Sequence, residues 1–132
     1  MNKERYINLL KEKFDNYNFI DLVIIYGSVL TNRFNDNSDI DIAVASRKII
    51  QPMFLLELKK DLEMLCKREI DIFDLSKDEG LINYKIITEG LVVKNNFSLF
   101  SKYHVNALIF YEDFFRKYQK IQEEKIRRFL NG

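Results

Sequence analysis

The 132-residue sequence contains one cysteine, one proline, one histidine and no tryptophan. A single thiol, Cys66, cannot form an internal disulfide, which is typical of a protein in the reducing cytoplasm. Residues 1–5 are mostly polar and do not resemble the apolar core of a signal peptide. The longest purely apolar run, residues 22–26, is far shorter than the ~20 residues that cross a bilayer. We therefore expect a cytoplasmic protein without a membrane span.

A strong charge of either sign is also absent. Lysine and arginine number 21 and aspartate and glutamate number 20, which gives a net charge of +1. Such a chain has no general field that attracts nucleic acid or an anionic membrane, and we expect neither as a direct partner. Hydrophobic residues make up 47% of the sequence, enough for a domain that buries roughly two thirds of its unfolded surface. Without a repeat, linker or low-complexity tract, residues 1–132 are predicted to form a single domain.

The apolar periodicity predicts both helices and strands. Spacings of three and four residues predict helices over residues 3–15, 52–68 and 78–89, and a helical region over 97–130 that is either one helix or two broken near 104–106. Apolar runs and strict alternation predict strands over residues 19–26, 39–45 and 69–75, and residues 91–94 are expected to form a short strand or an extended segment. A short helix over residues 29–34, capped by Ser28, is also expected. The predicted fold class is α/β (α+β), a short mixed sheet with helices packed on one side and a long C-terminal helix.

A Gly-Ser pair directly follows the first predicted strand, and an Asp-x-Asp pair follows ten residues later. Gly27 lacks a Cβ, which lets the chain turn sharply and lets a phosphate approach the backbone. Ser28 is expected at a helix N-terminus, where partial positive charge favours an anion. Asp39 and Asp41 lie on one predicted strand with side chains on the same face, about 6.6 Å apart at ~3.3 Å per residue. Two magnesium ions can share such a pair and clamp the oxygens of an in-line displacement.

A third aspartate on the next predicted strand completes the candidate site. Asp71 is expected to face the same way as the first two, to bind the catalytic metal and to help take the proton from the incoming hydroxyl. Asp74 is the rival, but it has the opposite parity and should face away unless a bulge intervenes. An isolated Asp-x-Asp pair is usually a solvated surface feature. Here the pair belongs to a core strand, where two like charges without a cation are costly, and we therefore favour a metal site.

These residues together form one motif, a Gly-Ser turn, an Asp-x-Asp pair and a later aspartate: Gly27, Ser28, Asp39, Asp41 and Asp71. The motif resembles that of the DNA polymerase β-like nucleotidyltransferase superfamily. Within this superfamily, the short chain resembles the MNT-type (minimal nucleotidyltransferase) antitoxins, which are paired with HEPN-domain toxins. The resemblance covers about residues 19–94, the predicted catalytic core, and the helical region over residues 97–130 agrees with it. It implies the nucleotidyltransferase fold.

The resemblance also implies a reaction, a cofactor and a partner. It implies transfer of AMP from ATP to a tyrosine hydroxyl of a HEPN toxin, with Mg²⁺ as cofactor in the form of two ions. The chain would then be an antitoxin that forms a hetero-oligomer with its toxin. The implied roles are phosphate binding by Gly27 and Ser28, binding of both metal ions by Asp39 and Asp41, and binding of the catalytic ion by Asp71.

One stretch departs from the pattern of this superfamily. Many relatives follow Gly-Ser with a pair of small residues, a basic residue and a glycine. Here the sequence continues Val-Leu-Thr-Asn-Arg. Arg33 is expected to supply the basic contact to the nucleotide from a shifted position.

Two other functions stay open at this point. A small-molecule nucleotidyltransferase, acting for example on an antibiotic hydroxyl, usually needs an additional substrate-binding domain. A non-catalytic antitoxin would neutralise its partner by binding alone, and the complete set of three aspartates argues against it. The last helical region carries more aromatic residues than a small domain can bury on one helix, so an exposed part of it is a candidate partner-binding face. The aromatic residues are Tyr103, Tyr111, Phe114, Phe115 and Tyr118.

Overall fold

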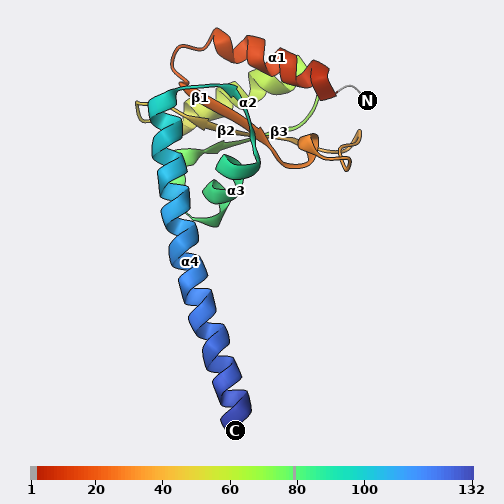
Figure 1. The fold of residues 1–132 in the computed structure, drawn as a ribbon. Helices are drawn as coiled ribbons and strands as arrows, with labels where there is room; N and C mark the ends of the chain where they lie inside the picture. Colours follow the sequence, from red (N-terminus) through yellow and green to blue (C-terminus); the bar gives the residue numbers. More distant parts are fainter. Residues whose placement is uncertain (1–2, 79) are drawn as a thin grey trace.

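A computed structural model of the chain describes residues 3–78 and 80–132 and shows a four-stranded sheet with four α-helices in these residues (Figure 1). The elements are, in chain order, α1 (Lys3–Asp15), β1 (Leu22–Tyr26), the 3-10 helix η1 (Gly27–Leu30), β2 (Ile40–Ala45), α2 (Pro52–Cys66), β3 (Ile70–Asp74), the 3-10 helix η2 (Leu75–Lys77), α3 (Leu81–Glu89), β4 (Leu91–Lys94) and α4 (Phe97–Asn131). The predicted mixed sheet and long C-terminal helix are thus confirmed.

The strand order of the sheet is β3-β2-β1-β4. β1 pairs antiparallel with both β2 and β4, whereas β2 and β3 run parallel. A parallel pair needs a crossover connection, and α2 supplies it. Because β1 runs opposite to β2 and β3, the C-terminal end of β1 and the N-terminal ends of β2 and β3 meet at one edge of the sheet. The Gly-Ser turn and the aspartate segments are therefore brought to the same edge.

Helices cover both faces of the sheet, which corrects the prediction that they pack on one side. On one face, α1 and α2 pack against alternate strand residues such as Val23 and Ile42. On the other face, α3 and the first part of α4 pack against Leu22, Ile24 and Ala43. The reason lies in β1, which is apolar on both faces and so needs cover on both sides. Asp41 has the same parity as Ala43, so the aspartates belong to the face that α3 and α4 cover.

α4 is one unbroken helix, so the alternative of two helices broken near residues 104–106 is wrong. Asn96 caps its first turn, because its side chain accepts a hydrogen bond from the Leu99 amide at 3.1 Å. Leu99, Tyr103 and Ala107 are buried against the domain, and the C-terminal part of the helix projects well beyond it (Figure 1). Within the part of the chain that the structure describes, no helix is both long and apolar enough to cross a membrane.

The predicted helix over residues 78–89 begins later than expected, at Leu81. The side chain of Asp74 accepts a hydrogen bond from the Ser76 amide at 2.9 Å and so favours the separate turn of η2. Asp78 is extended, and Glu79, which also falls in the predicted helix, lies outside the described residues. The remaining predicted helices and strands are confirmed with small differences at their ends, except for the short helix after β1.

Candidate active site

The candidate site lies at the edge of the sheet where β1 ends and β2 and β3 begin. Tyr26, the last residue of β1, pairs with Asp41 of β2, and Asp41 pairs with Asp71 of β3. Residues in register on neighbouring strands point to the same face of a sheet. Asp39 immediately precedes β2, two residues before Asp41. Side chains from three separate segments of the chain therefore meet at this edge.

The carboxylates at this edge influence one another. Asp41 is half-buried and Asp71 is exposed. Burial raises the pKa of Asp41, and the negative charges of Asp71 and Asp39 raise this pKa further. Burial also raises the pKa of the Tyr26 hydroxyl to about 12, with contributions from Asp41 and Asp71. The edge thus gathers negative charge that a bound cation would relieve.

The donor chemistry of this edge fits a divalent cation such as Mg²⁺, which prefers carboxylate oxygens. The carboxylates do not form a closed metal-binding cluster by themselves. Among the described residues, no group of three or more histidine, cysteine, aspartate or glutamate side chains is arranged to hold a metal ion. Mg²⁺ is usually bound through one or two protein carboxylates, with water and substrate phosphates as the remaining ligands. The edge therefore offers the protein's share of a ligand set that a nucleotide would complete.

Gly27 turns the chain off β1 directly beside Asp41. Its φ of +83° lies in the left-handed region that favours glycine. A Cβ at this position would lie 2.3 Å from Oδ2 of Asp41, which is closer than non-bonded atoms approach each other. The sequence analysis explained this glycine by the need for a phosphate to approach the backbone. The structure adds a second requirement, which is that the turn must leave room for the Asp41 carboxylate.

The turn after β1 is the 3-10 helix η1, so the prediction of a Ser28-capped helix over residues 29–34 is wrong. Tyr26 occupies the capping position, and its side chain makes no capping hydrogen bond. The amide and the hydroxyl of Thr31 both donate to the Ser28 carbonyl, each at 2.9 Å, and the chain is extended at Thr31. A helix of four residues has little macrodipole. An anion at this turn would therefore be held by its backbone amides and side chains and not by a helix dipole.

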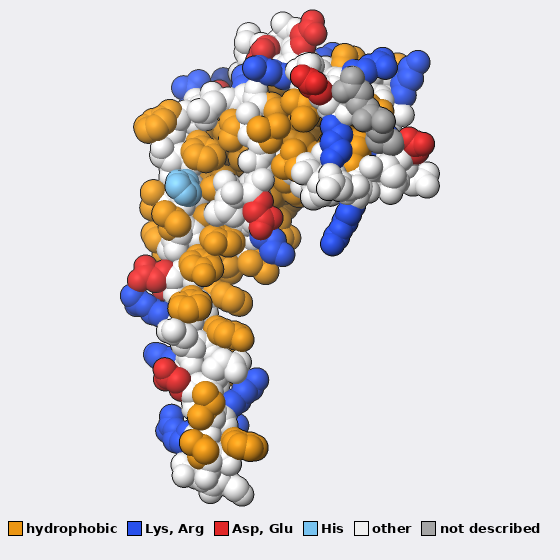
Figure 2. Space-filling view, turned by 45° about the vertical axis from the view of Figure 1, so that its right-hand side comes forward, with side chains coloured by type: hydrophobic (Ala, Val, Ile, Leu, Met, Phe, Trp, Pro, Cys, Tyr) orange, Lys and Arg blue, Asp and Glu red, His pale blue; other side chains and the backbone are white. Residues whose placement is uncertain are grey.

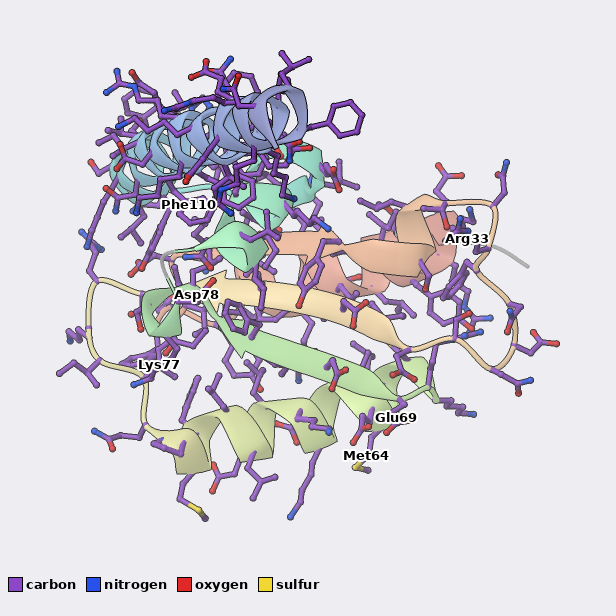
Figure 3. All side chains as sticks on the ribbon, turned by 90° about the horizontal axis from the view of Figure 1, so that it is seen from below. Arg33, Met64, Glu69, Lys77, Asp78 and Phe110 are labelled. Atoms are coloured by element: carbon purple, nitrogen blue, oxygen red, sulfur yellow. The ribbon has the colours of Figure 1, made fainter. Side chains whose placement is uncertain are left out.

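A hollow with a volume of about 430 Å³ lies beside this turn. Its lining residues are Gly27, Ser28, Leu30, Thr31, Arg33 and Glu89. The hollow thus brings together the three residues that the sequence predicted to bind the nucleotide. Arg33 lies on the loop between η1 and β2, beyond the end of the sheet (Figure 3), where its amide donates to the Thr31 hydroxyl at 3.1 Å.

A second hollow, of about 300 Å³, adjoins the first. Its lining residues are Tyr26, Gly27, Ile82, Lys85, Ile86 and Glu89. Gly27 and Glu89 line both hollows, so the two lie side by side, and together we call them the depression. Sequence reasoning missed the contribution of α3. No local pattern reveals it, because the place of α3 is set by the packing of Ile86 against the β1 residues Leu22 and Ile24.

Arg68 holds the loop that connects η1 to β2. Its Nη1 atom donates hydrogen bonds to the carbonyls of Asn35 at 2.7 Å and Ser38 at 2.6 Å. The guanidinium also lies over the rings of Tyr6 and Phe34, 5.0 and 4.4 Å from their centroids. This loop carries a predicted nucleotide-binding residue and leads into the first predicted metal ligand. Arg68 therefore fixes part of the site from outside it, a role that no pattern in the sequence indicates.

Asp74 faces away from the site, as its parity predicted. It pairs with Val44 without a shift in register, so no bulge alters the alternation along β3. The side chain is buried, and its Oδ1 atom accepts hydrogen bonds from the amide and hydroxyl of Ser76 at 2.9 and 2.8 Å. Lys77 and Asp78, which follow on the chain, lie at the opposite end of the sheet from Arg33 (Figure 3). Asp74 is therefore not part of the candidate site.

Comparison with known proteins defines the class to which this fold and site belong. Residues 8–97 match the family described as polymerase beta, nucleotidyltransferase. The match covers more than half of the chain and includes the whole sheet, with the Gly-Ser turn and the aspartates. The chain therefore belongs to the polymerase β nucleotidyltransferase family.

Particular known proteins also resemble the chain. It is 28% identical over 90 residues to the protein adenylyltransferase MntA of Shewanella oneidensis, a match that covers 68% of this chain and 63% of that relative. The matched segment thus spans less than two thirds of the length of the relative. A crystal structure of a toxin–antitoxin with AMP-PNP has a TM-score of 0.70 at 23% identity and covers 96% of this chain and 99% of that chain.

A second solved structure, a tri-AMPylated Shewanella oneidensis HEPN toxin in complex with MNT antitoxin, also has this fold. Its TM-score is 0.69 at 20% identity, and it covers 95% of this chain and 99% of that chain. Because both structural matches extend over almost the whole chain, they include the long α4. They confirm the predicted nucleotidyltransferase fold.

Proposed function

We propose that this chain is a metal-dependent protein adenylyltransferase that transfers AMP from ATP to a tyrosine hydroxyl of a partner HEPN-family toxin and so acts as its antitoxin. One observation carries the proposal. A left-handed glycine turn makes room for Asp41 at the edge where Asp71 stands in register with it. Family membership supports nucleotidyl transfer as the chemistry. The relative named protein adenylyltransferase and the complex with a tri-AMPylated toxin support the acceptor.

The three aspartates are proposed to bind Mg²⁺ and to receive the proton of the acceptor. Asp39 and Asp41 would bind two ions, and Asp71 would bind the catalytic one. When bound, the metal neutralises phosphate charge and increases the acidity of the acceptor hydroxyl. Asp71 is the most exposed of the three, so it is the one best placed to accept the proton as the hydroxyl oxygen bonds to the α-phosphorus.

The hollow beside the Gly-Ser turn is proposed to hold the part of ATP that leaves. Gly27 lets the β- and γ-phosphates approach the backbone, and Ser28 and Arg33 supply polar and positive contacts in the same hollow. The bond between the α-phosphorus and its bridging oxygen breaks, and pyrophosphate leaves. Because the donor is ATP and the Cys66 thiol is free, we propose a cytoplasmic location. We also propose that the chain acts as one domain, with a catalytic core over residues 19–94 and an added helical region over residues 97–130.

A label-transfer experiment tests the proposed function. The chain is mixed with a HEPN-family toxin, Mg²⁺ and α-³²P-labelled ATP, and label on the toxin is measured. We expect label on the wild-type toxin and none on a toxin whose acceptor tyrosine is replaced by phenylalanine. Asp39→Asn should abolish the labelling because it removes a proposed metal ligand, and EDTA should abolish it because it removes the Mg²⁺.

Two further measurements separate the two rival functions. If Asp39→Asn neutralises the toxin in cells as fully as the wild type, the chain acts by binding alone, contrary to the proposal. If no label reaches the toxin while label does reach a small hydroxyl compound, the chain is a small-molecule nucleotidyltransferase.

Arg68→Ala is expected to lower the rate of AMP transfer about 10- to 100-fold, the usual cost of losing a group that orients metal ligands. The loop before Asp39 would lose the donor that holds its two carbonyls. The Mg²⁺ concentration for half-maximal activity should rise, and this readout distinguishes a positioning role from general loss of stability. Arg68→Lys should recover part of the activity, since it keeps the charge but loses the planar guanidinium. Arg47→Ala is the matched control, because Arg47 is an exposed arginine whose ion pair is with Asp21; a rise in the Mg²⁺ requirement of both variants would contradict the assignment.

A further inference from the structure

The projecting part of α4 carries a line of exposed apolar side chains, which we name the α4 stripe. It consists of residues that are between 45% and 86% exposed: Tyr111, Phe114, Phe115, Tyr118, Ile121, Ile126 and Phe129. At ~100° per residue, these positions fall within an arc of about 140° around the helix. Most charged residues of this part of α4 fall on the opposite side, although Lys125 interrupts the α4 stripe. Hydrophobic side chains are visible along the helix in Figure 2.

The α4 stripe has the dimensions of a protein interface. At ~1.5 Å per residue, the segment from residue 111 to residue 129 is about 27 Å long. Fully buried aromatic side chains cover 150–250 Å² each, so this half-exposed set presents roughly 800 Å². That is about the area that each partner contributes to a standard interface, and it exceeds the largest apolar patch of a typical monomer. An area of this size calls for a partner surface that covers it.

The α4 stripe continues the line of α4 that packs on the domain. Tyr103 and Ala107 are buried in the core cluster beneath α3 and α4. One turn further on, Tyr111 stacks on Tyr84 of α3, with ring centroids 5.0 Å apart and planes 11° from parallel. Phe115 then stacks on Tyr111 with centroids 6.0 Å apart. These rings set the direction in which α4 leaves the domain and place the beginning of the α4 stripe against α3.

α3 connects the α4 stripe to the candidate active site. On one side of α3, Tyr84 contacts α4. On another side, Ile82 is 53% exposed and lines the hollow next to Gly27. Around the helix, the exposed Leu81 lies between them. Exposed apolar residues of α3, with Lys85 among them, therefore lie between the α4 stripe and the depression. α3 itself lies inside the corner that α4 makes with the domain (Figure 1).

We propose that the α4 stripe docks the acceptor protein and presents its hydroxyl to the edge that carries Asp41. The proposal rests on the proposed function for the identity of the acceptor. Tyr111, Phe114, Phe115 and Tyr118 have the spacing i, i+3, i+4 and i+7 by which a helix anchors in an apolar groove. The matching surface of the acceptor is therefore an apolar groove of about the same area. A second copy of this chain would instead fill the corner through which a protein acceptor must approach.

Two pairs of substitutions on α4 test the docking face. Phe114→Asp with Tyr118→Asp puts two charges into the α4 stripe, where these residues are 50% and 52% exposed. Val105→Asp with Ile109→Asp is the matched control on the opposite side of the same helix, where both residues are 54% exposed. The toxin Kd, labelling of the toxin at subsaturating concentration, and the Kd of Mg-ATP are measured for each protein.

The α4 stripe variant is expected to bind the toxin at least ~30-fold more weakly, as loss of a central aromatic anchor does, and to label it correspondingly less. Its Kd for Mg-ATP should stay that of the wild type, and the control variant should match the wild type throughout. Equal effects in the two variants, or no effect in the α4 stripe variant, would overturn the docking face. The docking face would also be overturned if the α4 stripe variant lost self-association and still bound the toxin, because the α4 stripe would then be covered by a second copy of this chain. If either double variant melts at a lower temperature than the wild type, two single substitutions replace the pairs. Tyr118→Arg then tests the α4 stripe and Ile109→Arg is its control, with the same expected results.

The result also separates the docking face from the proposed function. If the wild type binds the toxin through the α4 stripe but transfers no AMP, the proposed function fails and the docking face stands. If the wild type labels the toxin and the α4 stripe variant labels it equally well, the docking face fails and the proposed function stands.

Discussion

Asp41→Asn is expected to reduce AMP transfer at least ~10³-fold and, in the absence of metal, to make the protein more stable. The loss follows from the proposed role of Asp41 as a ligand to both metal ions, since metal catalysis contributes several kcal/mol and each ~1.36 kcal/mol is a factor of ten. The gain follows from the surroundings of this carboxylate. Burial and the charges of Asp71 and Asp39 raise its pKa, which means that its charged form is disfavoured in the folded protein. Asparagine has the same shape and no charge.

The gain in stability should depend on pH in a defined direction. A carboxyl group whose pKa is higher in the folded than in the unfolded state binds protons more tightly when folded. The wild-type protein therefore loses stability as the pH rises from the ordinary aspartate value of 3.8 through the raised pKa of Asp41. Asp41→Asn removes this loss, so its advantage in free energy of unfolding should grow over that range and then stay constant. Urea denaturation at several pH values measures it, and added Mg²⁺ should reduce it by stabilising only the wild type.

Asp74→Asn is the control for this prediction, because Asp74 is a buried aspartate on β3 that faces away from the site. It should leave AMP transfer near the wild-type rate, since an asparagine oxygen can still accept the hydrogen bonds of Ser76. Two results count against the interpretation. One is an Asp41→Asn protein that is less stable than the wild type without metal, and the other is a loss of transfer in both variants.

The backbone of the site could be predicted from the sequence because its signals are local. Strict alternation along residues 39–45 fixes which way Asp41 points, and the same parity argument separates Asp71 from Asp74. The apolar run before Gly27 marks the end of a strand. Such patterns depend on neighbouring residues, and the topology of a mixed sheet then brings the strand ends to one edge.

Other parts of the site depend on contacts between residues far apart in the sequence, and the sequence did not predict them. Arg68 reaches the loop carbonyl of Asn35, 33 positions earlier in the chain, and Glu89 reaches the hollow because α3 packs on β1. The prediction that the helices pack on one side of the sheet was wrong for a similar reason. β1 carries large apolar residues on both faces, whereas the second face of β2 carries only the small residues Ala43 and Ala45, so the signal for the second layer came from one short strand. The 3-10 form of η1 depends on the two hydrogen bonds from Thr31 to one carbonyl, which propensity does not reveal.

Gly27→Ala is expected to lower AMP transfer at least ~10²-fold, the cost of misplacing a reacting group by about 1 Å. The new Cβ would lie 2.3 Å from Oδ2 and 3.2 Å from Cγ of Asp41, so either this side chain or the turn must move. Alanine also pays roughly 1–2 kcal/mol for the left-handed conformation at a φ of +83°. The free energy of unfolding should fall by at least that amount, and the KM for ATP should rise with the loss in kcat. Steady-state kinetics and urea denaturation measure these changes.

Gly80→Ala is the control for the clash, because a Cβ at Gly80 would meet its nearest atom at 3.4 Å, an ordinary contact distance, and Gly80 lines neither hollow. It should match the wild type in its kinetics. A double-mutant cycle with Asp41→Ala then isolates the contact, since that substitution removes the atoms that the new Cβ would strike. The stability cost of Gly27→Ala should be smaller in the Asp41→Ala protein, where only the cost of the left-handed backbone conformation remains. An equal cost in both proteins would mean that the turn is strained independently of Asp41, and the close approach of glycine and carboxylate would then not explain why a glycine stands at this position.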